Sequence, residues 1–124
     1  MKLNPDCMRA VLLEMEKLPL GGSMRIEALT PVLGSFSPDD VVYTCIKLKE
    51  AGYIDALIKQ DRFGFSIFDL IDITFYGHQF IADIRDDNVW SKVKETATKI
   101  GSFSVDAITT IASKTIAEII RNQF

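Results

Sequence analysis

The side chains in this sequence that are best suited to binding a charged ligand are grouped in two short stretches. One stretch covers residues 38–50, and the other surrounds a turn expected at residues 60–64. Lysine and arginine contact phosphates, and lysine, arginine and threonine also reach base edges in the major groove of DNA. The candidate nucleic-acid-binding residues are Tyr43, Thr44, Lys47, Lys49, Lys59 and Arg62.

Acidic side chains oppose this candidate set. Asp39, Asp40 and Glu50 lie in the same stretch as Lys47 and Lys49. Few phosphate contacts and little counterion release are therefore expected, and we predict weak DNA binding by a monomer. The alternative interpretation is a solvent-exposed helix of mixed charge that has no nucleic-acid partner.

Other kinds of chemistry find little support in the sequence. His78 is the only histidine, so a Ser-His-Asp triad could use no other residue as its base, and no nucleophile-elbow sequence accompanies it. Gly21 and Gly22 lack the wider spacing and the lysine of a phosphate-binding loop. Cys7 and Cys45 show no CxxC spacing, so we interpret them as buried thiols. We expect no enzymatic activity, no metal and no cofactor.

The first stretch is positioned by a helix whose two ends are well marked. Ser37 is a good N-cap, followed by proline and two acids, and Gly52 suits the left-handed position after the helix. A rotation of 100° per residue turns Tyr43 and Lys47 outward, and we expect Thr44 beside them on the surface.

The elements around this helix have recognisable patterns. A helix is expected at residues 5–17, a short strand at 24–26, a short or kinked helix at 26–33, strands at 53–59 and 66–73, and a fourth helix from Thr74 to about Arg85. Pro31 limits the second of these helices. This order predicts a mostly α-helical protein with a small β-hairpin, namely a winged helix, which is a helix-turn-helix variant.

The C-terminal residues predict a helical tail. A helix at residues 89–100 ends at Gly101, and Ser104 caps a last helix with a wide apolar stripe. Such a stripe is too apolar to leave in water, so it indicates a homodimer interface. Packing within the chain and binding in the plane of a membrane remain the alternatives. The stripe consists of Val105, Ile108, Ile111, Ala112, Ile116, Ile119 and Ile120.

Length and composition limit the class of protein. The 124 residues are 48% hydrophobic, carry a net charge of −3 and contain no run of ~18 apolar residues that could span a membrane. No secretory signal is apparent at the N-terminus, so we expect a cytoplasmic location. We predict a winged-helix domain at residues 1–86 and a helical tail at residues 87–124, used for dimerisation or docking.

Several segments resemble a family of bacterial and prophage proteins of unknown function. They include residues 1–7, 48–54, 73–80, 90–94 and 101–106, and the resemblance covers nearly the whole chain. Residues 74–81 are also similar to the strand-to-helix junction of winged-helix transcription regulators. The resemblance implies a winged-helix-like domain with a helical tail and contributes no catalytic residue.

Two functions follow as hypotheses. The first is a DNA-binding regulator or accessory protein of prophage origin, acting as a homodimer. The second is a protein–protein interaction module without DNA binding, in which the winged-helix core is a scaffold and the tail docks on a host or phage protein.

Overall fold

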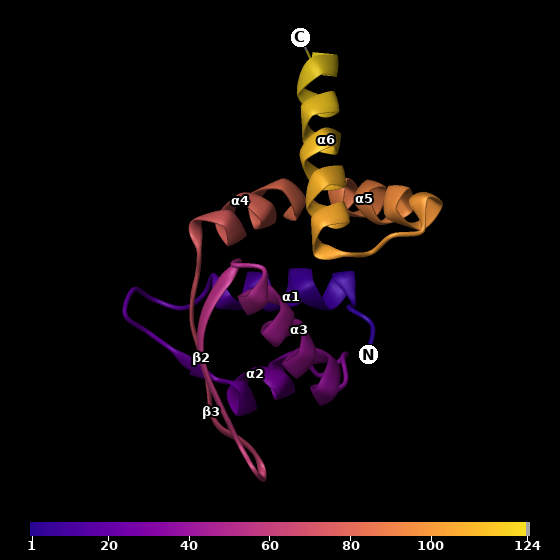
Figure 1. The fold of residues 1–124 in the computed structure, drawn as a ribbon. Coiled ribbons are helices and arrows are strands. Elements are labelled where there is room, and N and C mark those ends of the chain that lie inside the picture. The colour runs from indigo at the N-terminus through magenta and orange to yellow at the C-terminus, as the bar shows by residue number, and fades with distance from the viewer. Residues whose placement is uncertain (124) are drawn as a thin grey trace. The chain divides into compact units, whose positions relative to one another are not determined.

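The computed structural model of this protein describes residues 1–123, and within them it contains six helices and three strands (Figure 1). The chain divides into two compact units, Met1–His78 and Gln79–Phe124. The predicted mostly helical composition with a small β-hairpin is confirmed.

The first unit places three helices beside a small sheet. Figure 1 shows the hairpin running past these helices, with its turn extending beyond them. In chain order the elements are α1 (Pro5–Met15), β1 (Met24–Arg25), α2 (Ile26–Val32), α3 (Pro38–Glu50), β2 (Ile54–Asp61), β3 (Gly64–Ile73) and the start of α4 (Phe75–Ile84).

The helix starts in this unit are fixed by local hydrogen bonds. The Asn4 side chain accepts from the backbone N–H of Asp6 at 3.0 Å, and the Ser37 hydroxyl accepts from the N–H of Asp40 at 3.1 Å. Both caps satisfy amides that have no partner within the helix. Pro31 lies inside α2, which is only seven residues long, as predicted.

The sheet is antiparallel and has the strand order β1-β3-β2. The hairpin strands are longer than the sequence predicts, because pairing continues to Asp61 and Gly64 and leaves only Arg62 and Phe63 in the turn. Gly64 has a φ of +131°, a backbone conformation that a side chain would disfavour.

The core of the first unit lies between α1, α3 and one face of the sheet. α1 contacts α3, and both α1 and α3 contact the sheet. The side chains that fill this space are apolar and essentially inaccessible to solvent, as expected of a close-packed interior. They include Met8, Leu12, Leu48, Ile54 and Leu70.

A dense junction joins the end of the hairpin to α4. The Thr74 hydroxyl donates to the carbonyl of Gly52 at 2.5 Å and accepts from the N–H of Gly77 at 3.2 Å, so it caps α4 as predicted. The carbonyl of Tyr53 accepts from the N–H of Thr74 at 3.0 Å. Gly77 lies so close to this carbonyl that no side chain would fit there.

The second unit contains the rest of α4, then α5 (Asp87–Ile100) and α6 (Val105–Gln123). The Asp86 carboxylate caps α5, Gly101 ends it with a φ of +81°, and the Ser104 hydroxyl caps α6. α5 and α6 pack on each other. In Figure 1 α6 crosses α5, and the last turns of α6 extend beyond α5.

Among residues 1–123 no helix combines the length and the apolar character needed to cross a membrane.

Candidate nucleic-acid interface and helical tail

The outward side of α3 carries a cation that already has an anionic partner. The Lys47 ammonium lies 3.0 Å from a Glu50 carboxylate oxygen, one helical turn away, and 5.3 Å from the centre of the Tyr43 ring. The hydrogen bond and charge of Glu50 raise the pKa of Lys47. Lys47 therefore keeps its charge, but that charge is shared with a neighbouring acid before any ligand arrives.

Thr44 does not lie on the surface, contrary to the prediction. Its exposed fraction is 1%, because its angle on the helix groups it with Val41, Cys45 and Leu48 on the inner side. The nearby thiol of Cys7 on α1 donates to the carbonyl of Asp40 at 3.9 Å, one turn before Thr44 on α3. Thr44 therefore contributes to packing between α1 and α3 and has no access to a base edge.

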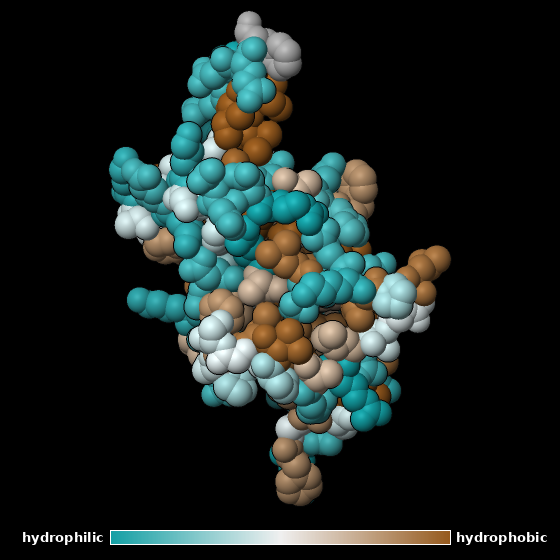
Figure 2. All heavy atoms as spheres, turned by 180° about the vertical axis from the view of Figure 1, so that it is seen from behind, coloured by the Kyte–Doolittle hydropathy of each residue, from teal (hydrophilic) through white to brown (hydrophobic). Residues whose placement is uncertain are grey.

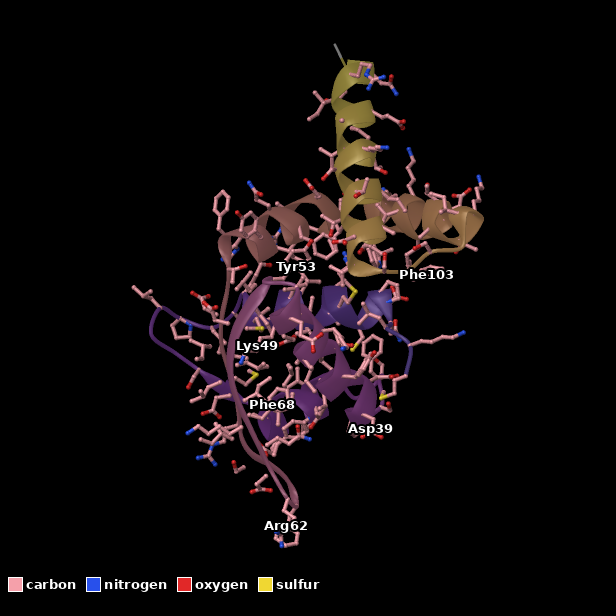
Figure 3. The ribbon with its side chains drawn as sticks, viewed as in Figure 1. Asp39, Lys49, Tyr53, Arg62, Phe68 and Phe103 are labelled. Atoms are coloured by element: carbon pink, nitrogen blue, oxygen red, sulfur yellow. The ribbon has the colours of Figure 1, made fainter. Side chains whose placement is uncertain are left out.

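The two ends of α3 differ in charge. Figure 3 shows Asp39 near its first turn and Lys49 near its last, on the same helix. The acids Asp39 and Asp40 in the first turn suit the positive end of the helix dipole, and Lys47 and Lys49 suit the negative end. Any phosphate contact from α3 is therefore favoured at its C-terminal end and disfavoured at its N-terminal end.

Two basic side chains lie at or near the turn of the hairpin, and Asp61 is their acidic neighbour in the sequence. Lys59 and Arg62 are exposed, and Figure 3 shows Arg62 at the very tip. The Asp61 carboxylate accepts from the N–H of Phe63 at 2.9 Å, which fixes the turn. Lys59 and Arg62 form no ion pair with any residue that the structure describes.

Phe63 falls within the predicted turn, but the sequence does not single it out as a candidate surface residue. Its exposed fraction is 94%, beside Arg62 at the hairpin tip. The sequence contained a usable indication, because an aspartate two positions before the phenylalanine and a glycine after it favour a tight turn. A side chain inside such a turn belongs to neither face of the sheet.

The apolar stripe of α6 is partly used within the chain. Ile108, Ile111 and Ala112 are buried, with exposed fractions of 0%, 7% and 0%. α6 packs on α5, whose inner side is formed by Trp90, Val93 and Ala97. The surface available to a second copy is therefore narrower than the sequence predicts.

The rest of the stripe remains accessible. Val105, Ile116 and Ile119 are half-buried, and Ile120 has an exposed fraction of 54%. Figure 2 shows apolar side chains gathered along one side of α6 toward its C-terminal end. This accessible part of the stripe is confined mainly to the last two turns of the helix.

The two thiols are not placed for chemistry. Cys7 and Cys45 are free and have no measurable exposure, and burial raises the pKa of Cys45 to about 12 and also raises the pKa of Cys7. A thiolate is the reactive form and the metal-binding form of cysteine. Within residues 1–123 no group of three His, Cys, Asp or Glu side chains could hold a metal ion.

Comparison with known proteins identifies a family and a bacterial relative. A family model described as "Hypothetical protein (DUF2513)" matches residues 2–104. A protein of Haemophilus influenzae described as "Uncharacterized protein" is 30% identical over 122 residues, covering 97% of this chain and 99% of its own length. No solved structure matches significantly.

Proposed function

We propose that this chain, which belongs to the family described as "Hypothetical protein (DUF2513)", is a small winged-helix DNA-binding regulator or accessory protein of prophage origin. Two features support the winged-helix assignment. The elements follow the order helix, strand, two helices and a hairpin, and β1 pairs with β3. Fold alone does not determine function, so the proposal has to be argued from the surface.

The observation that carries the proposal is the hairpin tip. Arg62 extends from the tip of the hairpin, beyond the three helices, and Lys59 lies on the same hairpin (Figure 3). Arginine and lysine on a projecting hairpin can reach backbone phosphates or a minor groove without any contribution from α3.

The helix α3 makes a smaller contribution in this proposal. Tyr43, Lys47 and Lys49 add contacts from its outward side and its last turn, whereas Asp39 and Asp40 repel phosphate at its first turn. Residues 1–78 contain eight basic and eleven acidic side chains, a net charge of −3. Binding is therefore weak for one copy and depends on few phosphate contacts.

A salt titration tests the proposal. Fluorescence anisotropy with a mixed-sequence duplex should show binding at low salt, with a log–log slope of about −2 to −3, as two or three phosphate contacts require. Lys59→Gln with Arg62→Gln should weaken binding at least tenfold. Complete absence of binding at low salt by the folded protein would rule out the regulator.

A matched control separates a local contact from net charge. Lys2→Gln with Lys17→Gln removes the same charge from exposed positions of the first unit, and it should change the affinity less than about twofold, because these lysines lie outside the proposed interface. Equal losses in the two double variants would contradict a role for the tip.

The ion pair on α3 favours a second candidate function, a protein–protein interaction module without DNA binding. In that case Lys47 and Glu50 form a mixed-charge helix surface, and the accessible end of α6 docks on a host or phage protein. The same titration distinguishes the two functions. The interaction module requires that the folded protein has no affinity for DNA at low salt.

A further inference from the structure

The outer face of the sheet, which turns away from the core, carries two exposed apolar side chains. Leu57 on β2 has an exposed fraction of 45%, and Ile71 on β3 one of 43%. Ile71 lies where the strand register shifts, so it has no direct partner on β2. Exposed aliphatic side chains on a sheet face are costly in water when they lie together, so a contact that covers them would stabilise the protein.

A groove of about 300 Å³ lies beside these two side chains. One wall is the loop at residues 19–23, which connects α1 to β1, and the floor and other wall contain Leu57, Asp69, Ile71 and Asp72. Figure 1 shows this loop beside the sheet on the side away from α3. A groove of this size is at the lower limit for ligand sites, so it suits one anchoring side chain with its flanking residues.

The loop wall is already in a fixed conformation. The N–H of Gly22 donates to the carbonyl of Pro19 at 2.9 Å, and Gly21 has a φ of +79°. A Cβ at Gly22 would lie 3.0 Å from the proline ring, so glycine permits this tight turn. A preformed wall lowers the entropy cost of binding.

The charge around the groove is mainly negative: three aspartates lie there, and Arg25 on β1 lies opposite Asp69. Asp55 on β2 lies directly opposite Asp72 on β3, and Asp69 lies opposite Leu57. Like charges opposite each other on a sheet destabilise it. None of the three aspartates forms an ion pair within residues 1–123. A cationic ligand would relieve this repulsion, whereas a nucleic acid would increase it.

We propose that this groove docks a short peptide segment of a partner protein, in which one large aliphatic side chain is flanked by lysine or arginine. The aliphatic side chain covers Leu57 and Ile71, and the flanking cations pair with Asp69 and Asp72. The two requirements, one apolar and one cationic, define the specificity together. This interaction uses a different surface from the hairpin tip and holds whether or not the protein binds DNA.

A synthetic peptide tests the docking groove with the full-length protein. The probe is a nonapeptide with one central leucine and two lysines on each side, and a second peptide replaces the leucine with serine. In NMR titrations of the ¹⁵N-labelled protein, the leucine peptide should shift the amides of residues 21–23 and of Leu57, Asp69 and Ile71. The serine peptide should need at least tenfold higher concentration for the same shifts.

Charge variants separate this groove from general attraction to an acidic protein. Asp69→Asn with Asp72→Asn keeps the side-chain shape and should weaken binding at least tenfold at low salt. Asp39→Asn with Asp40→Asn removes the same charge from α3 and should leave the affinity within about twofold.

Three results would overturn the proposal. The first is the absence of shifts in the groove at millimolar leucine peptide, and the second is equal binding of the leucine and serine peptides, which would mean attraction of any cation. The third is an equal loss of affinity in the two pairs of aspartate variants. Each of them leaves the DNA titration unaffected, so failure here is distinct from failure of the proposed function.

Discussion

At the scale of single residues, Gly77 is the position where neighbouring backbone leaves no room for a side chain. It lies against the carbonyl of Tyr53, which also accepts the hydrogen bond from the N–H of Thr74 at 3.0 Å. A Cβ at this position would also lie 2.6 Å from a methyl group of Ile73. The obstacle is mainly backbone, so it cannot be removed by rotating a side chain.

We therefore predict that Gly77→Ala destabilises the protein, although alanine is the better helix former by about 1 kcal/mol. Overpacking typically costs about 1–3 kcal/mol, and here the carbonyl must also move away from its donor. Urea unfolding followed by circular dichroism measures the change in free energy. Ala82→Gly, at an exposed position of α4, is the control for propensity alone and should cost about 1 kcal/mol. An unchanged or raised stability for Gly77→Ala would contradict the tight junction.

The thiols provide a second prediction at this scale. Burial raises the pKa of Cys45 to about 12, so at pH 8 roughly one molecule in ten thousand carries the thiolate at this position. Cys7 is equally inaccessible and its pKa is raised as well. Ellman's reagent should therefore modify neither thiol in the native protein within an hour and both in denaturant. The Cys45→Ala variant assigns any residual reaction, and rapid modification under native conditions would contradict the burial of these side chains.

At the scale of elements, the sequence was most informative where structure depends on neighbouring residues. Asn4, Ser37 and Gly101 fix helix ends by hydrogen bonds or backbone angles within a few residues, and all three were predicted in these roles. Hairpin length was less predictable. It depends on how far β2 and β3 pair toward the turn, and this pairing joins residues on two strands rather than neighbours in the sequence.

The candidate site was predicted less well than the helices, for two physical reasons. Thr44 was expected on the surface beside Tyr43 and Lys47, but its angle on α3 places it on the inner side of the helix. Ile108 and Ile111 were expected at an interface because they are apolar, but α6 buries them on packing with α5. An apolar stripe indicates that a surface will be covered and does not indicate what covers it.

At the scale of the whole molecule, the accessible end of α6 would matter if the protein binds DNA weakly, as proposed. One copy offers few phosphate contacts, but two copies joined through α6 would present two hairpin tips, and the second contact then forms at high effective concentration. The remaining apolar surface of α6 suits a second copy of the same helix. The residues beside Ile116 and Ile120 are Ser113 and Ala117, which are small and uncharged and permit close approach.

This dimer gives the last prediction. Ile116→Asp with Ile120→Asp places charges in the accessible part of the stripe and should convert a dimer to a monomer, because each buried carboxylate would lose its hydration. Ile108 is fully buried, whereas Ile116 is half-buried and Ile120 is exposed, so the melting temperature of the monomer should fall less than it would with a charge at Ile108. Light scattering coupled to size exclusion measures the mass. Thr110→Asp, at an exposed position of α6 that is not part of the stripe, is the control and should remain dimeric. If the dimer strengthens DNA binding, the double variant should also lose affinity at least tenfold, although its hairpin tip is intact. A wild-type protein that is already monomeric at micromolar concentration would refute the α6 interface, and the hairpin tip would then have to bind DNA from a single copy.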